Sequence, residues 1–241
     1  MAAVIKKQFK LEFAEQVGVL FMVLLFATVF GQVLMALIAH FDSTVKRHVQ
    51  VSTIMTLVFG LVFVGITILH NIRLQFHIQV SMGCTRKRFF VSYYLMCFAV
   101  ALAGWIMIMV VAFLEETMNP ILYSDLESAN VEMIPYLLKW GIPVSTALVI
   151  LCNFCGILMM RFGRIATGIL WVVWMVACLG FPNLDDAVEN MPNSLFGKLG
   201  GGVLYLIMRI PVPVWIALGV GICVACLIAS YLMIRKLEVK P

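Results

Sequence analysis

The sequence predicts an all-α integral membrane protein with six transmembrane helices, and two observations lead to this prediction. Hydrophobic residues make up 63% of the 241 residues, charged residues make up 12%, and the mean hydropathy is +1.05. Soluble domains are roughly 45–50% apolar and about 25% charged, so a soluble fold is excluded. The apolar residues also gather in six runs, most of them as long as the roughly 20 residues that a helix needs to cross the hydrocarbon.

Residues 1–16 predict a basic amphipathic entry helix. At 3.6 residues per turn, Lys6, Lys7 and Lys10 fall within an arc of about 100°. The neighbouring arc collects the apolar residues Ile5, Phe9 and Phe13. Such a helix suits the cytoplasmic headgroups, where it would lie before the chain turns into the bilayer. The alternative is that these lysines only fix the topology.

The spans belong to one transmembrane domain that covers residues 1–241. We expect them at 17–39, 51–70, 91–114, 136–160, 165–181 and 210–234. The first run is too long for the core of a signal peptide and lacks a clear Ala-x-Ala end, so we expect a retained helix. Residues 115–135 are too polar for the bilayer and predict an outer loop. Residues 182–209 predict a second outer loop, whose glycine-broken apolar stretch fits a re-entrant segment.

The basic residues set the predicted orientation. Six spans place both termini on one side, and that side receives 12 of the 17 Lys and Arg residues. Because Lys and Arg collect in the cytoplasm, we expect both termini and residues 71–90 to be cytoplasmic. The same placement beside apolar spans accounts for the net charge of +5, so we expect no nucleic-acid partner.

Residues 71–90 form the longest basic and polar interruption between spans. Apolar and polar residues alternate from Ile72 to Ser81, which is the pattern of a half-buried strand. A helix that continues the second span and ends at Gly83 satisfies the backbone without a partner strand. Thr85 is suited to cap the next helix. The basic residues Arg86, Lys87 and Arg88 follow it at the N-terminal end of that helix, where the helix dipole disfavours positive charge. Their presence suggests a role in topology, headgroup contact or partner binding.

Residues 82–90, Met-Gly-Cys-Thr-Arg-Lys-Arg-Phe-Phe, resemble a family signature. Small bacterial permeases of the type-2 ATP-binding-cassette (ABC) exporter family carry Gly-x-Ser/Thr-Arg-x-x-Phe between their second and third spans. Gly83, Thr85, Arg86 and Phe89 match it, whereas Cys84 replaces the usual aliphatic residue. The layout of the chain is also similar to that family, with a basic entry helix, six spans, cytoplasmic termini and a long outer segment before the last span.

The resemblance implies a permease subunit of an exporter in the bacterial plasma membrane. Its cargo would be a hydrophobic or amphipathic substrate such as a drug, an antimicrobial peptide or a lipid. Residues 71–90 would be a cytoplasmic coupling segment that docks on a separate dimeric ABC ATPase, where ATP and Mg²⁺ bind. The implied coupling residues are Gln79, Met82, Gly83, Thr85, Arg86, Lys87 and Arg88. A second permease chain, identical or homologous, would complete the pathway within the membrane lipid.

This chain itself is expected to be non-catalytic and to bind no cofactor. The phosphate-binding pattern Gly-x-x-x-x-Gly-Lys-Ser/Thr is absent from the sequence, so any ATP that drives it must bind a partner. No nucleophile and base can be paired, and Glu115-Glu116 matches no complete protease motif. An alternative function is that of an ATP-independent membrane facilitator, or of a small membrane immunity or scaffold protein.

Two uncharged polar residues, Gln32 and Asn153, lie deepest in the predicted spans. They would either bond neighbouring helices or line a translocation path. We see no charge deep in any predicted span, which argues against an ion pump and fits an amphipathic cargo. The two Cys-x-x-Cys pairs have the spacing of zinc ligands, but they lie in apolar spans, so we expect helix packing and no metal site. These pairs are Cys152 with Cys155 and Cys223 with Cys226.

Overall fold

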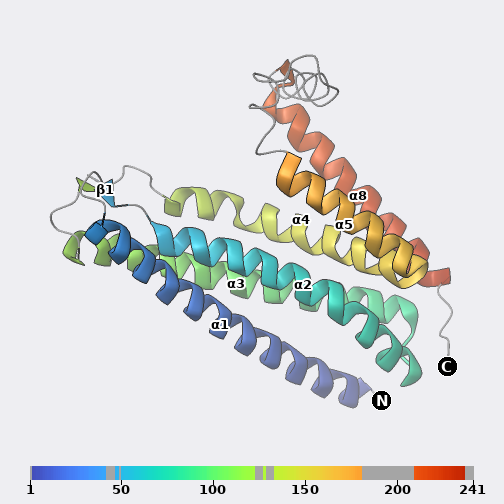
Figure 1. Cartoon of the computed structure of the whole chain (residues 1–241). Coiled ribbons are helices and arrows are strands. Elements are labelled where there is room, and N and C mark those ends of the chain that lie inside the picture. The colour runs from blue at the N-terminus through green and yellow to red at the C-terminus, as the bar shows by residue number, and fades with distance from the viewer. Residues whose placement is uncertain are drawn as a thin grey trace. The chain divides into compact units, whose positions relative to one another are not determined.

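The computed structural model describes residues 2–41, 47–48, 50–122, 127–128, 133–180 and 209–236. These residues are helical apart from one pair of short strands and a few residues in the turns beside the helices (Figure 1). In chain order the elements are α1 (Ala2–Phe41), β1 (Arg47–His48), α2 (Val51–Ser81), α3 (Arg86–Leu122), β2 (Glu127–Ser128), α4 (Met133–Phe162), α5 (Arg164–Gly180) and α8 (Val212–Lys236).

Among the described residues, five helices are long and apolar enough to cross a membrane: α1 from Glu12 onward, α2, α3, α4 and α8. The prediction of a helical, multi-pass membrane protein is therefore confirmed. The fifth expected span corresponds to α5, which is apolar but only 17 residues long. A count of six spans, and the side of the membrane on which the termini lie, remain predictions.

Several helices extend beyond their predicted spans. The helix α1 is continuous from Ala2 to Phe41, so the backbone does not break between the expected entry helix and the first span. No glycine or proline occurs before Gly18 to interrupt it. The helix α2 contains 31 residues, a length of about 46 Å. Because the hydrocarbon core is about 30 Å thick, α2 extends beyond it.

The third helix corrects one expectation. Residues 115–122 were expected to begin an outer loop, but they continue α3 to Leu122. Buried residues recur along α3 with helical spacing and extend through this region: Ala101, Gly104, Ile108, Ala112, Glu115 and Asn119. The buried face of the helix thus continues past the last apolar run. Pro120 lies in the last turn of α3, where it removes one backbone hydrogen bond shortly before the helix ends.

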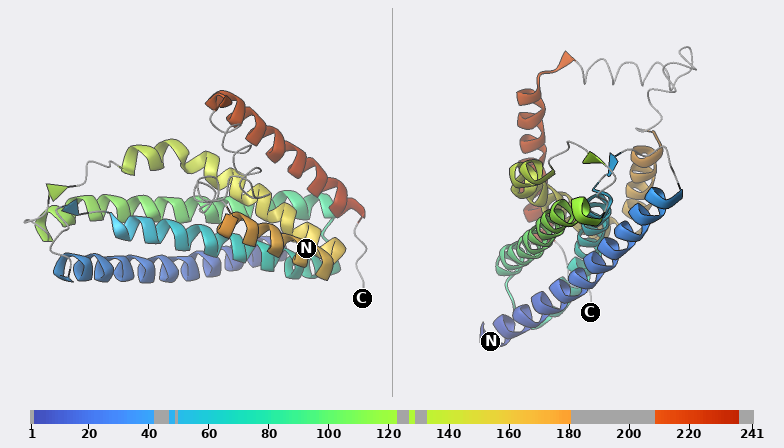
Figure 2. Two further views of the ribbon diagram at one scale, coloured as in Figure 1. Left: turned by 45° about the horizontal axis from the view of Figure 1, so that its top comes forward. Right: turned by 90° about the vertical axis from the view of Figure 1, so that its left-hand side faces the viewer.

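The chain divides into two compact units, Met1–Asn153 and Phe154–Glu238. In the first unit α1, α2 and α3 lie side by side, as Figures 1 and 2 show from different directions. Glycines let these helices approach closely. A Cβ atom at Gly60 would lie 3.1 Å from a methyl carbon of Leu24, and one at Gly104 would lie 3.0 Å from a methyl carbon of Leu20. Small residues at such contacts are typical of helix packing in membranes.

The first part of α4 joins the same unit through Trp105. The indole Nε1 of this residue donates a hydrogen bond to the backbone oxygen of Leu137 at 3.0 Å. One turn further along α4, Gly141 presents bare backbone to the indole ring, and a Cβ atom there would overlap it. The absence of a side chain at Gly141 therefore permits this packing.

The strands β1 and β2 pair in parallel, with Arg47 opposite Glu127 and His48 opposite Ser128. They belong to the α1–α2 and α3–α4 connections, so the pairing holds these two connections at the same end of the helices. Spans that alternate in direction predict this arrangement. In the text below, this end is called the loop end of the first unit, and the end with the α2–α3 turn is called the turn end.

The second unit contains the end of α4 together with α5 and α8. The expected spans at 136–160 and 165–181 leave only residues 161–164 between them, and the structure has a tight turn there. Gly163 adopts a φ of 58° there, and its backbone nitrogen donates to the oxygen of Met159 at 2.9 Å. A left-handed residue of this kind, usually glycine, commonly ends a helix. The predicted outer loop at 182–209, including its re-entrant stretch, lies outside the described residues except for Arg209.

Candidate functional site

The carboxylate of Glu115 lies at the start of α2. This side chain is 2% exposed, although it comes from α3. One oxygen accepts a hydrogen bond from the backbone nitrogen of Ser52 at 2.9 Å. The other accepts from the backbone nitrogen and the hydroxyl of Thr53, both at 2.7 Å. Glu115 therefore satisfies the first turn of α2 across the interface between two helices.

The first turn of a helix explains why a carboxylate is placed there. The initial N–H groups of a helix have no partner within it, and together they carry a partial positive charge. Gln50 occupies the N-cap position of α2 but forms no side-chain capping hydrogen bond. Glu115 supplies the missing acceptor. Hydrogen bonds to a charged group contribute about 1.5–3 kcal/mol each, more than neutral ones.

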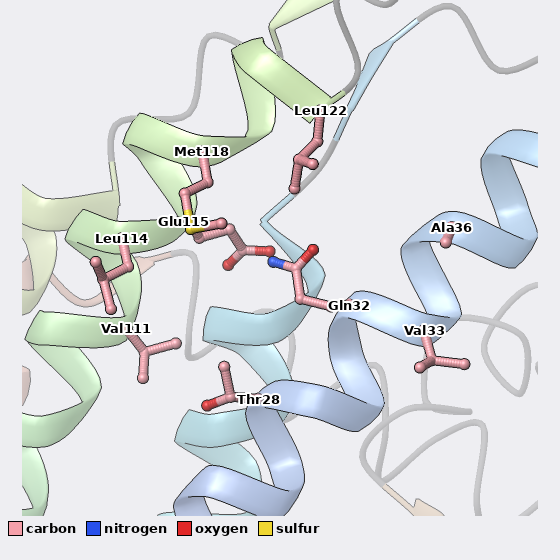
Figure 3. Close-up of a pocket in the computed structure, with 9 residues that line it drawn as sticks. All are labelled: Thr28, Gln32, Val33, Ala36, Val111, Leu114, Glu115, Met118 and Leu122. Carbon is pink, nitrogen blue, oxygen red and sulfur yellow. The ribbon is translucent and has the colours of Figure 1, made fainter.

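A cavity of about 390 Å³ opens beside Glu115, between α1 and α3 (Figure 3). Its polar end is formed by Thr28, Gln32 and Glu115. Its walls are the apolar side chains of Val33, Ala36, Val111, Leu114, Met118 and Leu122. This volume falls within the roughly 300–1,000 Å³ that is typical of small-molecule sites, which likewise combine apolar walls with few polar groups. We call this cavity the Glu115 pocket.

Gln32 on α1 faces this carboxylate across the pocket. In Figure 3 the amide nitrogen of Gln32 is turned toward Glu115, and its amide oxygen is turned away. That oxygen is buried and has no hydrogen-bond partner. Below Gln32 the Thr28 hydroxyl lies 3.3 Å from the Thr56 hydroxyl of α2. Of the two residues predicted for a translocation path, Gln32 therefore does line a pocket, although this does not test transport.

Other buried polar atoms on the same helix ends lack partners in the described part of the chain. Asn119 follows Glu115 by one turn of α3, is 1% exposed, and has neither its amide nitrogen nor its amide oxygen bonded. On α2 the same is true of the Ser52 hydroxyl, and just before α2 of the Gln50 amide oxygen. Unpaired buried polar groups are costly in a membrane protein, so their accumulation marks the loop end as a polar region.

Asn153, the second candidate for a path, lies elsewhere. It is fully buried in α4, and its amide nitrogen donates to the backbone oxygen of Val149 at 2.8 Å. Its amide oxygen has no partner. Asn153 does not line the Glu115 pocket, so the structure does not bring Gln32 and Asn153 into one cavity. The prediction that they share a path is untested.

A second cavity, of about 360 Å³, lies between α1 and α2 toward the turn end. Polar and apolar side chains line it: Glu12, Glu15, Gln16, Val19, Phe63, Ile66, Thr67, His70, Asn71 and Gln75. Between the two cavities α1 packs tightly on its neighbours, because Leu20 is buried against Gly104 of α3 and Leu24 against Gly60 of α2. The two cavities are therefore separate sites.

The predicted coupling segment forms a helix, a turn and a second helix. The helix α2 continues to Ser81, which decides between strand and helix for residues 71–81. Gly83 adopts a φ of 83°, and its nitrogen donates to the oxygen of Val80 at 3.0 Å. Thr85 caps α3, because its hydroxyl accepts from the backbone nitrogen of Arg88 at 3.4 Å. The predicted helix end and the predicted cap are both confirmed.

Aromatic side chains hold this turn to the bundle. The rings of Phe76 on α2 and Phe89 on α3 meet edge to face with centroids 5.3 Å apart. Phe89 stacks in turn on Tyr93 at 5.4 Å, and the Tyr93 hydroxyl donates to the backbone oxygen of Ile68 at 3.3 Å. Aromatic pairs of this kind stabilise beyond their buried area. The base of the turn is therefore firmly packed.

The seven residues predicted for coupling differ in exposure. Gly83, Thr85, Lys87 and Arg88 are exposed, and Met82 and Arg86 are half-buried. Gln79 is only 5% exposed, so its side chain does not lie on the surface that a partner would meet. The basic tip of the turn is consequently formed by the exposed side chains of Lys87 and Arg88. Contact with an ATPase remains a prediction for all seven residues.

No metal-binding cluster occurs in the described ranges, where no group of three or more His, Cys, Asp or Glu side chains lies together. No disulfide joins the six cysteines whose side chains the structure describes, which include both Cys-x-x-Cys pairs. The neighbouring acids Glu115 and Glu116 point to different surroundings, since Glu115 is buried and Glu116 is exposed.

Comparison with known proteins identifies no relative, because no family model, no curated protein and no solved structure matches this chain. The function is therefore inferred from the geometry of the chain itself.

Proposed function

We propose that this chain is the permease subunit of an exporter in the bacterial plasma membrane. It moves a hydrophobic or amphipathic substrate, and a separate ABC-type ATPase subunit, which holds ATP and Mg²⁺, supplies the energy. The observation that carries the proposal is the exposed basic tip of the α2–α3 turn on two helices that are longer than a bilayer is thick.

The length of the two helices supports a contact outside the membrane. The helices α2 and α3 contain 31 and 37 residues, or about 46 and 56 Å, against about 30 Å of hydrocarbon. A part of this hairpin therefore lies beyond the hydrocarbon core. A charged tip in that position suits a soluble protein partner with a complementary acidic surface.

The packing at the base of the turn supports coupling. A partner that binds the tip can change the permease only if it contacts two conformations differently. Phe76, Phe89 and Tyr93 join the turn to both helices, so a displacement of the tip moves α2 and α3 together. In this proposal the ATPase dimer binds one turn from each of two permease chains.

The test is to replace Lys87 and Arg88 with alanine and to measure the ATPase that co-purifies with the tagged permease. Loss of both exposed charges should lower the recovered ATPase at least about tenfold, because rim charges of an interface steer and hold the partner. ATP hydrolysis stimulated by the substrate should fall in parallel.

The matched control replaces Arg164 and Lys236, two exposed basic residues that are also predicted to be cytoplasmic. This variant should retain the ATPase. Labelling of a cysteine introduced at Thr85 would establish that each variant is inserted with the turn in the cytoplasm. Equal recovery from both double variants would refute the docking role, and transport by the isolated chain without any ATPase would favour a facilitator.

A further inference from the structure

The Glu115 pocket combines a buried acid with apolar walls, and this combination selects a class of ligand. We infer that the pocket binds an amphipathic amine, with its protonated nitrogen at the carboxylate of Glu115 and its hydrocarbon part along α1 and α3.

The polar end of the pocket offers acceptors to a cation. No Lys, Arg or His side chain lines the pocket, and the described partners of Glu115 are two backbone N–H groups and one hydroxyl. The negative charge is thus held by dipoles and not cancelled by a basic side chain. A protonated amine has donors only, so it complements the carboxylate.

The walls of the pocket suit a hydrocarbon chain that arrives from the lipid. Val33 is 51% exposed, Met118 48% and Leu122 57%, which places these walls at the surface of spans that face the bilayer. An amphipathic molecule can therefore enter sideways with its apolar part still in an apolar environment. The cost of desolvating its charged head is offset at Glu115, where a fixed acceptor replaces water.

Other ligand classes fit the pocket less well. An anion would meet the carboxylate of Glu115 directly. A divalent cation such as Ca²⁺ requires six to eight oxygen ligands, whereas a single carboxylate lines this pocket. A neutral alcohol of equal length fills the walls equally well but brings no charge, so it is the most informative comparison for an amine.

This inference goes beyond the proposed function. Binding of an amine to the pocket does not depend on the ATPase. Only the identification of that amine with the exported cargo rests on the permease proposal. The two can therefore fail separately. Binding is tested on the isolated chain, whereas docking is tested at Lys87 and Arg88.

The experiment uses the full chain in nanodiscs of zwitterionic phosphatidylcholine and a decylamine that carries a photoreactive diazirine at the end of its chain. Decanol and decanoate with the same diazirine are the matched probes. Labelled residues are located by mass spectrometry. We expect saturable labelling of α1 and α3 around the pocket by the amine, at least about tenfold stronger than by the alcohol or the acid, because the alcohol brings no positive charge to the carboxylate and the acid brings a like charge.

Two variants make the test specific. Glu115→Gln should lower amine labelling at least about tenfold and lower alcohol labelling much less, because only the amine loses an ionic partner. Ala36→Trp fills the pocket from its wall without touching Glu115 and should abolish labelling by both probes. Met22→Trp is its control, because Met22 lies on the same helix, is 65% exposed and does not line the pocket. Equal labelling by amine and alcohol, or equal labelling of the two tryptophan variants, would overturn the inference.

Discussion

The two ends of α2 are secured in different ways. At the loop end the first turn of α2 bonds to Glu115, whose hydrogen bonds to Ser52 and Thr53 span 63 and 62 residues of sequence. At the turn end the chain reverses through bonds between residues three to five apart, such as the one from Gly83 to Val80. The first end depends on packed helices, whereas the second depends on local turn chemistry. Substitutions can separate these two modes.

The largest effect is expected from Glu115→Ala. It leaves two backbone N–H groups and the Thr53 hydroxyl without their acceptor, and each unsatisfied buried group costs about 1–3 kcal/mol. Since water and local fraying recover part of this loss, we expect the free energy of unfolding to fall by about 3 kcal/mol. Titration of mixed micelles with SDS, followed by circular dichroism, measures the change.

Hydrogen exchange sharpens this prediction. In Glu115→Ala the amides of Ser52 and Thr53 should lose protection, whereas the amide of Phe89, which donates to Thr85 at 2.9 Å, should keep it. Glu116→Ala is the control, because this exposed neighbour should change stability by less than about 0.5 kcal/mol. Equal effects of the two alanine variants would contradict the role of Glu115 as a cap.

A smaller effect is expected from Gly83→Ala at the turn end. The φ of 83° is disfavoured for a residue with a Cβ atom, so the variant should lose about 1 kcal/mol of folding free energy. The same titration measures it. Gly18→Ala is a suitable control, because Gly18 lies within α1 with nothing within 4 Å of an added Cβ. That substitution should leave stability unchanged or raise it. A Gly83→Ala variant as stable as Gly18→Ala would show that the turn tolerates another conformation.

The smallest effect is expected from Thr85→Ala, which removes the cap of α3. Its hydrogen bond to the Arg88 nitrogen is long, at 3.4 Å, and exposed, so the loss should be near the low end for caps, about 0.5 kcal/mol. Thr85→Ser keeps the hydroxyl and should retain most of the stability. A loss as large as that of Glu115→Ala would contradict the distinction between the two ends.

The sequence predicted the helical membrane fold because apolar runs and their polar boundaries are local features. It also predicted the end of α2 at Gly83 and the cap at Thr85, since glycine and threonine act on neighbouring backbone. It missed the extension of α3 to Leu122. Two adjacent glutamates read as a loop if each residue is judged by its own polarity, but the stripe of buried positions from Ala101 to Asn119 continues through Glu115.

The Glu115 pocket could not be read from composition for the same reason. Its acid was assigned to a loop outside the spans, which left Gln32 as an isolated polar residue. One signal was present: α2 begins after Gln50 with no acidic residue in its first turn, so its N–H groups needed an acceptor from elsewhere. Finding which helix supplied it required the packing of α1, α2 and α3. The coupling role of the basic tip stays a prediction, and the burial of Gln79 makes that residue its least accessible member.

The unbroken course of α2 has a mechanical consequence. The helix contains no proline and runs without a break from its first turn, which bonds to Glu115, to Ser81 beside the basic tip. If an ATPase docks as proposed, a displacement of the basic tip would be transmitted along this helix toward its first turn. At that turn the displacement would act on the hydrogen bonds of Glu115. The position of α2 and the shape of the Glu115 pocket would therefore change together.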